Sequence, residues 1–413
     1  MTDIHTVSYH PVTEKEITVL LPASKSISNR LLIIKALSGY LENIHNLSEA
    51  QDTETLLEIL KNVNQKEHNA KLGGTTFRFL LAYLALLRND FILTAEGEMQ
   101  NRPIKELVDA LNSLGAEIEY IKEEGKPPVH IKRGNMHGGT ISIDATKSSQ
   151  FVSALMLIAP YLQGGLTIRL QGEPVSKPYI EMTAKLMREF GVDIAVNYPE
   201  IVVKEGKYAN KTYFVENDWS AASYIYQSFL FSQNLQKVKI PYLYKNSIQG
   251  DVEVYNIYSN FGIQTTFLDD AVILTKEEKK ELPSKFTYNF FNNPDLAQTL
   301  AVTCSLLKIP AELEGLQTLL HKETNRIAAL QNELKKLNVD AQFDQTNNRL
   351  VIHPENLAKP QSAISTYNDH RMAMAFSSAA QIFGQIEMEN PMVVNKSFPH
   401  FWEEMKKFGI SLS

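Results

Sequence analysis

The sequence predicts an α/β protein with two domains, each containing three copies of one unit of helices and strands. A chain of 413 residues with 44% hydrophobic content is long enough for two or three domains. A pattern of helix, turn and alternating strand recurs at regular intervals. A second pattern, a polar turn that opens an apolar helix, recurs with the same interval. Six such copies divide most simply into two domains of three.

The turn between helix and strand carries glycine or asparagine in five places. Successive turn residues lie 71 or 76 positions apart, and both residue types suit the left-handed conformation that ends a helix. They are Gly115, Gly191, Gly262, Asn338 and Gly409. We infer that one unit of about 70 to 75 residues is copied along the chain.

Apolar helices rich in Ala, Ser and Leu open at residues 24, 73, 147, 217, 292 and 367. Because they are apolar nearly all round, we expect each to lie at the centre of its domain, with the polar starts converging. The first copy is short, with 48 residues from Ser26 to Gly74. Its second helix runs into the charged segment 65–71 with no strand pair after it, so we expect a surface deletion there.

The domain boundaries follow from the repeats. If the first strand ends at Leu21, the chain enters one domain near residue 22 and leaves it near Val215, where another copy begins. We therefore expect one domain at 22–215 and a second built from 1–21 and 216–413. Two crossovers of this kind predict a hinge with a cleft between the domains.

Composition excludes several classes of function. A net charge of −6 gives no overall basic field for non-specific nucleic-acid binding, so no nucleic-acid partner is expected. The one cysteine, Cys304, lies in an apolar helix and excludes an intrachain disulfide or a zinc site built on several cysteines. With no glycine-rich nucleotide motif and no residue set at metal-ligand spacing, we expect neither a cofactor nor a metal.

The N-terminal stretch has no leader-like charged and apolar regions, and the longest apolar runs fall well short of the ~20 residues that span a bilayer. We expect a cytoplasmic monomer that does not associate with membranes.

The stretch LPASKSISNR, residues 21–30, places unusual charges at a helix start. Ser24 can cap the helix, and Lys25, Ser26 and Arg30 crowd its first turns. Cations there oppose the helix dipole, which favours anions. A solvated helix end is the alternative, but an anionic ligand held by backbone N–H groups, hydroxyls and two cations explains the arrangement better.

Other helix starts carry polar groups that suit an anion or a polyol, although each also fits an ordinary turn or cap. Gly74 lies in a Gly-Thr helix start, and Arg102 precedes Pro103, which reads as the first residue of a helix. The remaining candidates in this half of the chain are Ser148, Ser149, Gln150, Ser176 and Tyr179.

In the second half, Asp295 precedes an apolar helix, where N-capping is its commonest role. Lys322 and Arg326 are four residues apart and are predicted to share a helix face, with Glu323 about 100° round. They fit a surface ion-pair ladder, or a phosphate site with a carboxyl group placed for proton transfer. Arg371 and Lys396 complete the cationic set.

Taken together, the motifs resemble those of one enzyme family. In order they read LPASKSISNR, GGTTFRF, the Arg102 turn, SSQF, VSKPYIE, NPD, KETNR, YNDHRMAM and NKSFPHF, and they extend over essentially the whole chain. This series is similar to that of the EPSP synthases, 3-phosphoshikimate 1-carboxyvinyltransferases. The resemblance implies two domains of three βαβαββ-type units, an inside-out α/β barrel that closes over its substrates.

The resemblance also implies an activity. These enzymes transfer the enolpyruvyl group of phosphoenolpyruvate to the 5-hydroxyl of shikimate 3-phosphate and release phosphate, on the route to chorismate and aromatic amino acids. Matched motif by motif, the residues for phosphoenolpyruvate are Lys25, Gly74, Arg102, Gln150, Arg326, Arg371 and Lys396. Those for shikimate 3-phosphate are Ser26, Arg30, Ser148, Ser149, Ser176, Asp295 and Lys322, with Tyr179 nearby. Glu323 and Lys25 are candidates for the C3 proton and Asp295 for the hydroxyl proton.

The chain departs from the usual motifs at Leu72, Phe79, Thr318 and Asn325. Three alternative hypotheses are the sister enolpyruvyl transferase that acts on UDP-N-acetylglucosamine, a protein similar to RNA 3′-phosphate cyclases, and an inactive binding protein. The first typically has a reactive loop cysteine, the second a basic surface, and the third would not need the complete set of acid, base and cations.

Overall fold

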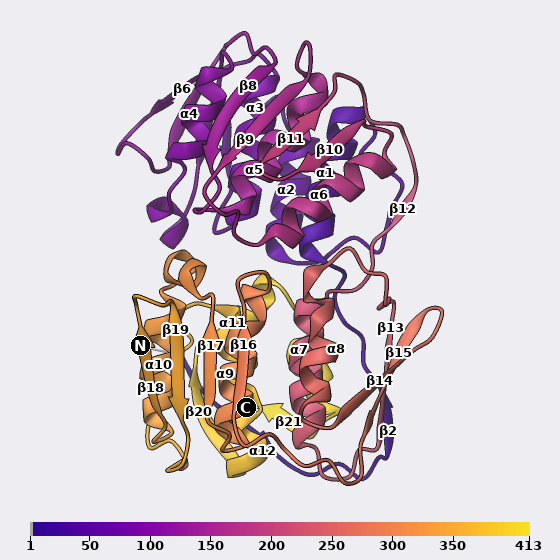
Figure 1. The fold of residues 1–413 in the computed structure, drawn as a ribbon, viewed down its shortest axis with the longest axis vertical. Helices are drawn as coiled ribbons and strands as arrows, with labels where there is room; N and C mark the ends of the chain where they lie inside the picture. Colours follow the sequence, from indigo (N-terminus) through magenta and orange to yellow (C-terminus); the bar gives the residue numbers. More distant parts are fainter. Residues whose placement is uncertain (1–2) are drawn as a thin grey trace. The chain divides into compact units, whose positions relative to one another are not determined.

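In the computed structural model, which describes residues 3–413, the chain divides into two compact units (Figure 1). Unit 1 comprises Met1–Pro22 and Glu216–Ser413, and unit 2 comprises Ala23–Val215. The chain thus changes units after Pro22, one residue later than the expected position, and after Val215. The strand before the first crossover ends at Thr18 and not at Leu21 as expected.

Unit 2 contains six α-helices and two 3₁₀ helices among the described residues. The helices are α1 (Lys25–Ser38), α2 (Gln51–Lys61), α3 (Gly74–Leu86), η1 (Gly97–Asn101), α4 (Lys105–Ser113), α5 (Ser149–Ile158), η2 (Ala159–Tyr161) and α6 (Lys177–Glu189). Its strands are β3 (Ile44–His45), β4 (Glu67–Asn69), β5 (Phe91–Thr94), β6 (Glu117–Tyr120), β7 (Val129–Lys132), β8 (Gly139–Asp144), β9 (Leu166–Gln171), β10 (Ile194–Asn197), β11 (Glu200–Val203) and β12 (Tyr213–Phe214).

Unit 1 follows the same plan. Its helices are α7 (Trp219–Phe231), η3 (Gly250–Glu253), α8 (Val254–Ser259), η4 (Pro294–Leu296), α9 (Ala297–Leu306), η5 (Gln317–His321), α10 (Arg326–Lys336), α11 (His370–Ser377), α12 (Ala379–Phe383), η6 (Pro391–Lys396) and α13 (Phe401–Lys406). Its strands are β1 (Ile4–Tyr9), β2 (Glu16–Thr18), β13 (Lys237–Pro241), β14 (Ile263–Phe267), β15 (Ala271–Lys276), β16 (Phe286–Asn289), β17 (Ala311–Glu314), β18 (Asp340–Asp344), β19 (Arg349–His353), β20 (Gln385–Glu389) and β21 (Ile410–Leu412).

Four sheets share one topology, which confirms that a single unit is repeated. In the sheet β8-β9-β11-β10, β8 pairs parallel with β9, and β9 pairs antiparallel with the hairpin of β11 and β10. The sheets β4-β5-β7-β6, β2-β13-β15-β14 and β16-β17-β19-β18 repeat this order and these directions. The strands described here form separate sheets and no closed barrel.

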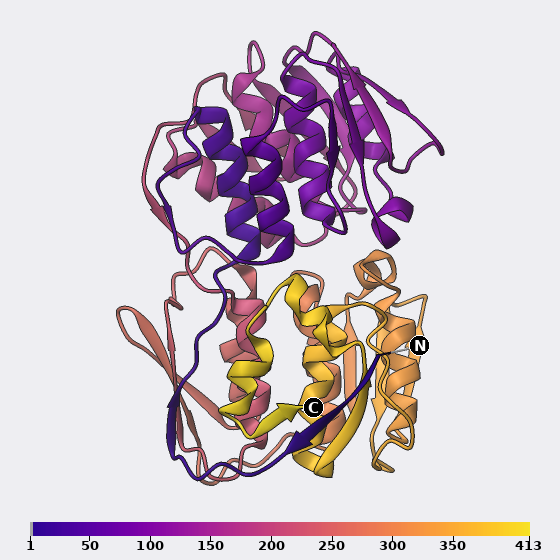
Figure 2. The same cartoon turned by 180° about the vertical axis from the view of Figure 1, so that it is seen from behind.

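The two remaining sheets are variants of the same plan. The shortened first copy has only the parallel pair β3 and β12, and it lacks the hairpin, as expected. In the last copy, Ile364 forms a parallel bridge with Met388 of β20, and β20 pairs with β1 and β1 with β21. The N-terminal strand β1 therefore takes the place of a hairpin strand, and it lies beside the C-terminal segments (Figure 2).

The crossovers exchange two leading strands. In sequence, β2 precedes α1, but it pairs with β13 in unit 1. Likewise, β12 precedes α7, but it pairs with β3 in unit 2. The strand that precedes α1 of unit 2 thus belongs to a sheet of unit 1, and the strand that precedes α7 of unit 1 belongs to a sheet of unit 2.

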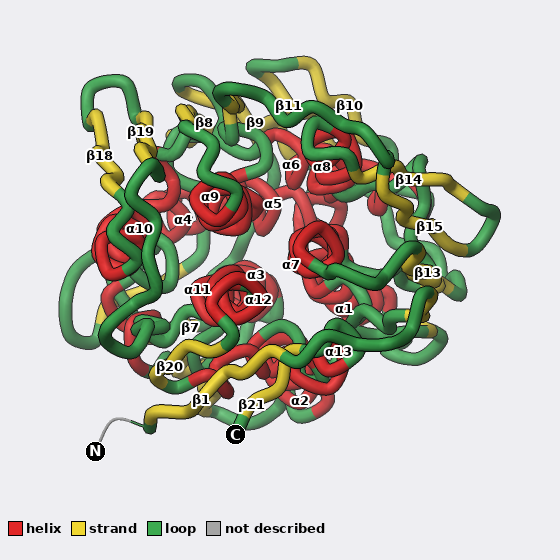
Figure 3. Tube along the Cα trace, turned by 90° about the horizontal axis from the view of Figure 1, so that it is seen from below, coloured by secondary structure: helices red, strands yellow, loops and turns green. Residues whose placement is uncertain are grey.

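The helices and turns form where the sequence pattern predicts. The five turn residues all have positive φ, from 57° at Asn338 to 93° at Gly115. The six apolar helices α1, α3, α5, α7, α9 and α11 are largely buried. Figure 3 shows α7, α9 and α11 end-on and side by side in unit 1, with strands around them. Their starts meet at one end of the unit, because a helix bundle surrounded by sheets leaves only its ends for polar groups.

Candidate active site

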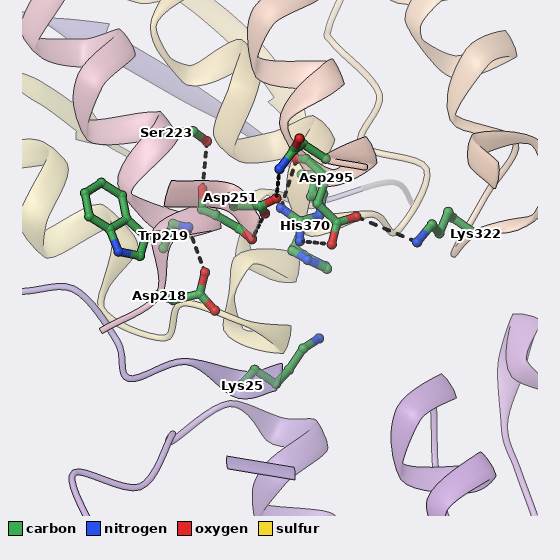
Figure 4. A network of polar contacts seen from close by, with 12 residues as sticks. Lys25, Asp218, Trp219, Ser223, Asp251, Asp295, Lys322 and His370 are labelled. Carbon is green, nitrogen blue, oxygen red and sulfur yellow. Dashed lines mark hydrogen bonds and ion pairs between the residues drawn. The ribbon is translucent and has the colours of Figure 1, made fainter. Parts of the chain in front are cut away.

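Asp295 is the centre of the polar cluster at the helix starts of unit 1 (Figure 4). Its Oδ2 lies 2.8 Å from Nη2 of Arg371, and its Oδ1 lies 3.1 Å from Nη1 of Arg326. Nζ of Lys322 is 3.8 Å from Oδ1. Asp295 lies within η4 and not at the cap position of either helix there, which is Asn293 for η4 and Leu296 for α9, and its carboxylate pairs with three cations.

Arg326 binds three carboxylates and is 1% exposed. Its Nε donates to Asp369 at 2.7 Å and its Nη2 donates to Glu323 at 2.7 Å, in addition to the contact with Asp295. Asp369 also caps α11, because its Oδ1 accepts a hydrogen bond from the backbone N–H of Arg371. The buried guanidinium therefore holds the starts of α10, η4 and α11 together.

The charges in this cluster shift each other's protonation. Burial alone would raise the pKa of Asp295, but the cations of Arg371, Lys322 and Arg326 hold it well below its usual range. Burial would lower the pKa of Arg326, yet the carboxylates of Asp369, Glu323 and Asp295 raise it above its ordinary value. At neutral pH Asp295 and Arg326 are therefore both ionised.

A second carboxyl group, Asp251, lies beside this cluster and is 3% exposed. It accepts a hydrogen bond from Ser220 Oγ, and Nδ2 of Asn293 is 3.5 Å from its Oδ1. Burial, and then the charge of Asp295, raise the pKa of Asp251 to about 6. Within the described chain no lysine, arginine or histidine forms an ion pair with it.

The other two expected cations of unit 1 differ in their surroundings. Nη1 of Arg371 donates to Tyr224 Oη at 3.3 Å and to the Asp295 carbonyl at 3.2 Å. Lys396, in η6, donates to the carbonyl of Asn368 at 2.7 Å, next to Asp369 in the chain. The structure thus gathers Asp295, Lys322, Glu323, Arg326 and Arg371 into one network.

In unit 2, Lys25 forms an ion pair with Asp52 at the start of α2, with 3.0 Å between Nζ and Oδ2. Ser24 caps α1, since its Oγ accepts a hydrogen bond from the N–H of Ile27. The Asp52 carbonyl accepts a hydrogen bond from Thr76 of α3 at 2.8 Å. One carboxylate residue therefore joins the starts of three helices and holds the Lys25 ammonium near them.

Arg30 is buried, with 2% exposure, and among residues 3–413 its hydrogen-bond acceptors are neutral hydroxyl and carbonyl oxygens. It donates to Thr183 Oγ1 at 2.7 Å and to the carbonyls of Ser26 and Tyr179 at 2.8 and 3.2 Å. The guanidinium also lies 5.4 Å from the ring centre of Phe79. Burial lowers its pKa to about 10, so it keeps its charge with no carboxylate paired to it among the described residues.

Gly74 and Arg102 are in close contact. A Cβ atom on Gly74 would lie 2.3 Å from Nη1 of Arg102, so the guanidinium occupies the space that a side chain would fill. Nε of Arg102 is buried without a hydrogen-bond partner in the described part of the chain. Pro103 is not the first helical residue as predicted, because α4 begins at Lys105 after the η1 turn.

The start of α5 is linked to α3. Gln150 accepts a hydrogen bond from Nη1 of Arg78 at 2.5 Å and donates to Thr75 at 2.9 Å. Ser148 caps α5 and Ser149 is its first residue, 8% exposed. The remaining expected residues also lie at helix starts: Ser26 in α1, Tyr179 in α6, and Ser176 at the cap position of α6 with a φ of 54°.

The helix predicted to carry Lys322, Glu323 and Arg326 together does not form. Lys322 and Glu323 do not lie on a helix with Arg326, because Asn325 caps α10 by accepting from Ala328 N–H and the helix begins at Arg326. Lys322 and Arg326 still reach the same carboxylate. The sequence did not point to Asp52, Arg78 or Asp251 as site residues, and Asp369 stood out only as the neighbour of His370 and Arg371. The only signal for these carboxylates was their position near helix starts.

The sequence-based expectations also concern the cysteine, the possible metal ligands and the helices. Cys304 is buried in α9, where burial raises its pKa far above the ordinary value. Residues 3–413 contain no group of three or more His, Cys, Asp or Glu side chains suited to hold a metal ion. Within the same range, every helix is too short or too polar to cross a membrane.

Comparison with known proteins identifies the family. A model of the EPSP synthase (3-phosphoshikimate 1-carboxyvinyltransferase) family matches residues 64–405. A 3-phosphoshikimate 1-carboxyvinyltransferase of Bacteroides fragilis (strain YCH46) is 40% identical over 397 residues, which cover 96% of each chain. The chain belongs to the EPSP synthase family.

More distant relatives agree with this membership. A 3-phosphoshikimate 1-carboxyvinyltransferase of Vibrio atlanticus (strain LGP32) is 34% identical over 437 aligned positions, covering 98% of this chain and 100% of the relative. An EPSP synthase structure from Acinetobacter baumannii superposes with a TM-score of 0.77 at 19% identity, covering 99% of both chains. The EPSP synthase family therefore accounts for both the ordered motifs and the repeated fold.

Proposed function

We propose that this protein transfers the enolpyruvyl group of phosphoenolpyruvate to the 5-hydroxyl of shikimate 3-phosphate and releases phosphate. The observation that carries this proposal is the single network in which Asp295, between three cations, lies next to Glu323 and Arg326. Cations there suit the phosphate and carboxylate groups of the two substrates, and the carboxylates suit proton transfer.

The residue roles proposed for unit 2 come from the matched motifs, and the surroundings of Arg30 support one of them. Arg30 is a buried cation with neutral acceptors, and an anionic substrate group would offset its charge. The residues assigned to shikimate 3-phosphate are Ser26, Arg30, Ser148, Ser149, Ser176 and Tyr179. Those assigned to phosphoenolpyruvate are Lys25, Gly74, Arg102 and Gln150.

In unit 1, Arg326, Arg371 and Lys396 are assigned to phosphoenolpyruvate, and Lys322 to shikimate 3-phosphate. Asp295 accepts the proton of the 5-hydroxyl while the hydroxyl oxygen attacks C2 of phosphoenolpyruvate. Glu323 and Lys25 are the candidates for proton transfer at C3 of phosphoenolpyruvate. Substrate anions compete with Asp295 for the same cations. Because bound substrates weaken the hold of these cations on Asp295, they raise its proton affinity. The tetrahedral intermediate then loses phosphate and a C3 proton.

The test is a phosphate-release assay with purified protein. Release must require both phosphoenolpyruvate and shikimate 3-phosphate and must continue in the presence of a metal chelator. Release only with UDP-N-acetylglucosamine as acceptor would contradict the proposal. Cys304 argues against that acceptor, because it is buried in an apolar helix and is the one cysteine of the chain.

A further inference from the structure

Asp295 has an unusual environment for a group that accepts a proton. Arg371, Arg326 and Lys322 all lie within 3.8 Å of its carboxylate oxygens, so its negative charge is strongly stabilised. A general base works best when its proton affinity is matched to the pH at which it operates. The three cations therefore make Asp295 a poor base unless another group opposes them.

The charge of Glu323 already raises the pKa of Asp295 against these cations, and Asp251 is a second carboxyl group that can do the same. It lies at the start of η3, is 3% exposed, and interacts electrostatically with Asp295 (Figure 4). Its hydrogen-bond donors are neutral, namely Ser220 Oγ and, at 3.5 Å, Nδ2 of Asn293. Asn293 also donates to the Gly250 carbonyl at 2.7 Å and immediately precedes η4, so it ties the Asp251 turn to the segment that carries Asp295.

We propose that Asp251 is a positioning residue for the reaction, whose negative charge keeps Asp295 able to accept a proton. In a buried environment the repulsion between two carboxylates is weakly screened, so the charge of Asp251 counteracts part of the stabilisation that the cations give. Asp251 itself touches neither substrate in this account. The inference rests on the proposed function, because it assigns Asp295 the role of proton acceptor.

Several groups act on Asp251 from the surrounding elements. Asp295 in η4 and Asp218 at the start of α7 raise its proton affinity, whereas Arg371 in α11 and the hydroxyl of Ser220 lower it. Tyr288 of β16 remains neutral near pH 7, because burial and then the charges of Glu253 and Asp251 raise its pKa to about 12. Since the net effect on Asp251 is a pKa of about 6, the residue is ionised above this pH and neutral below it.

The expected pH dependence follows from this sign. As pH rises through about 6, Asp251 becomes negative, Asp295 becomes a better base, and the single-turnover rate of phosphate release should increase. Asp251→Asn removes the charge but retains an acceptor for Ser220. It should lower the single-turnover rate at about pH 8 by about tenfold, abolish the rise near pH 6, and change both KM values less than about threefold.

Ser220→Ala is the second variant, and it keeps Asp251 in place. Loss of the hydroxyl removes a hydrogen bond to the ionised carboxylate, so the rise in rate should move to higher pH. Asp269→Asn, at the exposed turn between β14 and β15, is the matched control and should leave the profile unchanged. If Asp251→Asn keeps the pH profile of the wild-type protein, Asp251 has only a structural role and the proposal is overturned. If Asp251→Asn does not fold, an unchanged pH profile in Ser220→Ala overturns the proposal instead.

These experiments distinguish a failure of the proposed function from a failure of the role proposed for Asp251. Wild-type protein that releases no phosphate with both substrates present contradicts the proposed function before any variant is made. Wild-type protein that is active, with variants that keep its pH profile, contradicts only the role of Asp251.

Discussion

The two units place arginine at the starts of their buried helices in opposite electrostatic settings. In unit 2, Arg30 donates to hydroxyl and carbonyl oxygens and packs near Phe79. In unit 1, Arg326 is surrounded by Asp295, Glu323 and Asp369. The same repeated fold therefore supports one arginine with no carboxylate paired to it among residues 3–413 and another that the protein itself neutralises.

This difference separates two tasks. A buried cation with only neutral acceptors is costly until an anion binds, so it is suited to recognise a phosphate. A buried cation among carboxylates stabilises the fold and sets the protonation of those carboxylates, so it is suited to the proton transfers. We infer that unit 2 mainly recognises anionic groups and that unit 1 also carries the acid and base chemistry.

The largest expected effect is on turnover in Asp295→Ala. Loss of the proposed base should lower kcat by about a thousandfold, while binding of shikimate 3-phosphate, measured by calorimetry, changes far less. Asp269→Ala, at an exposed turn, is the control. Equal losses in turnover and binding would instead make Asp295 a residue that positions the substrate.

The next effect is on stability in Arg326→Met. Removing the guanidinium leaves Asp369, which is fully buried, and two further carboxylates without their shared cation. We expect a loss of about 3–5 kcal/mol in the free energy of unfolding, measured by urea denaturation. Arg349→Met is the matched control. Arg349 makes partly exposed ion pairs with Glu312 and Asp344 at 3.6 Å, so its loss should cost about 1 kcal/mol or less. Similar losses in both variants would refute the buried-network argument.

A smaller effect is expected for Gly74→Ala. The added methyl group would collide with the guanidinium of Arg102, which is the mobile end of a side chain, so Arg102 should move while the fold is retained. KM for phosphoenolpyruvate should rise about tenfold with little change in Tm. Gly206→Ala, where a Cβ meets no atom within 4 Å, provides the control. An unchanged KM would remove Arg102 from the phosphoenolpyruvate site.

Much of the fold could be predicted because its signals are local. Positive φ at Gly115 or Asn338 needs a residue type that tolerates it, and an apolar helix must be buried. The absent hairpin of the first copy followed from its length alone. The exchange of β2 and β12 could not be predicted, since pairing between segments as far apart as Ile44 and Tyr213, or Glu16 and Lys237, leaves no periodic signal in either short strand.

The site could be predicted in part for a similar reason. Lys25 and Arg30 were found because they stand in the first turns of a helix, where cations oppose the helix dipole. The carboxylates that pair with cations of the site, Asp52 and Asp369, come from other segments, and an aspartate near a helix start looks the same in sequence whether it caps the helix or forms an ion pair. The helix-face argument for Lys322 and Arg326 was wrong because Asn325 caps α10 and starts the helix only at Arg326.

The central claim is that Arg30, which no carboxylate of the described residues 3–413 pairs with, is held ready for an anionic ligand, and one comparison tests it most directly. Arg30→Met should weaken binding of shikimate 3-phosphate by about a hundredfold or more in calorimetry, whereas the Tm of the ligand-free protein stays equal or rises, because a costly buried charge has been removed. A large fall in Tm with unchanged affinity for shikimate 3-phosphate would contradict the account.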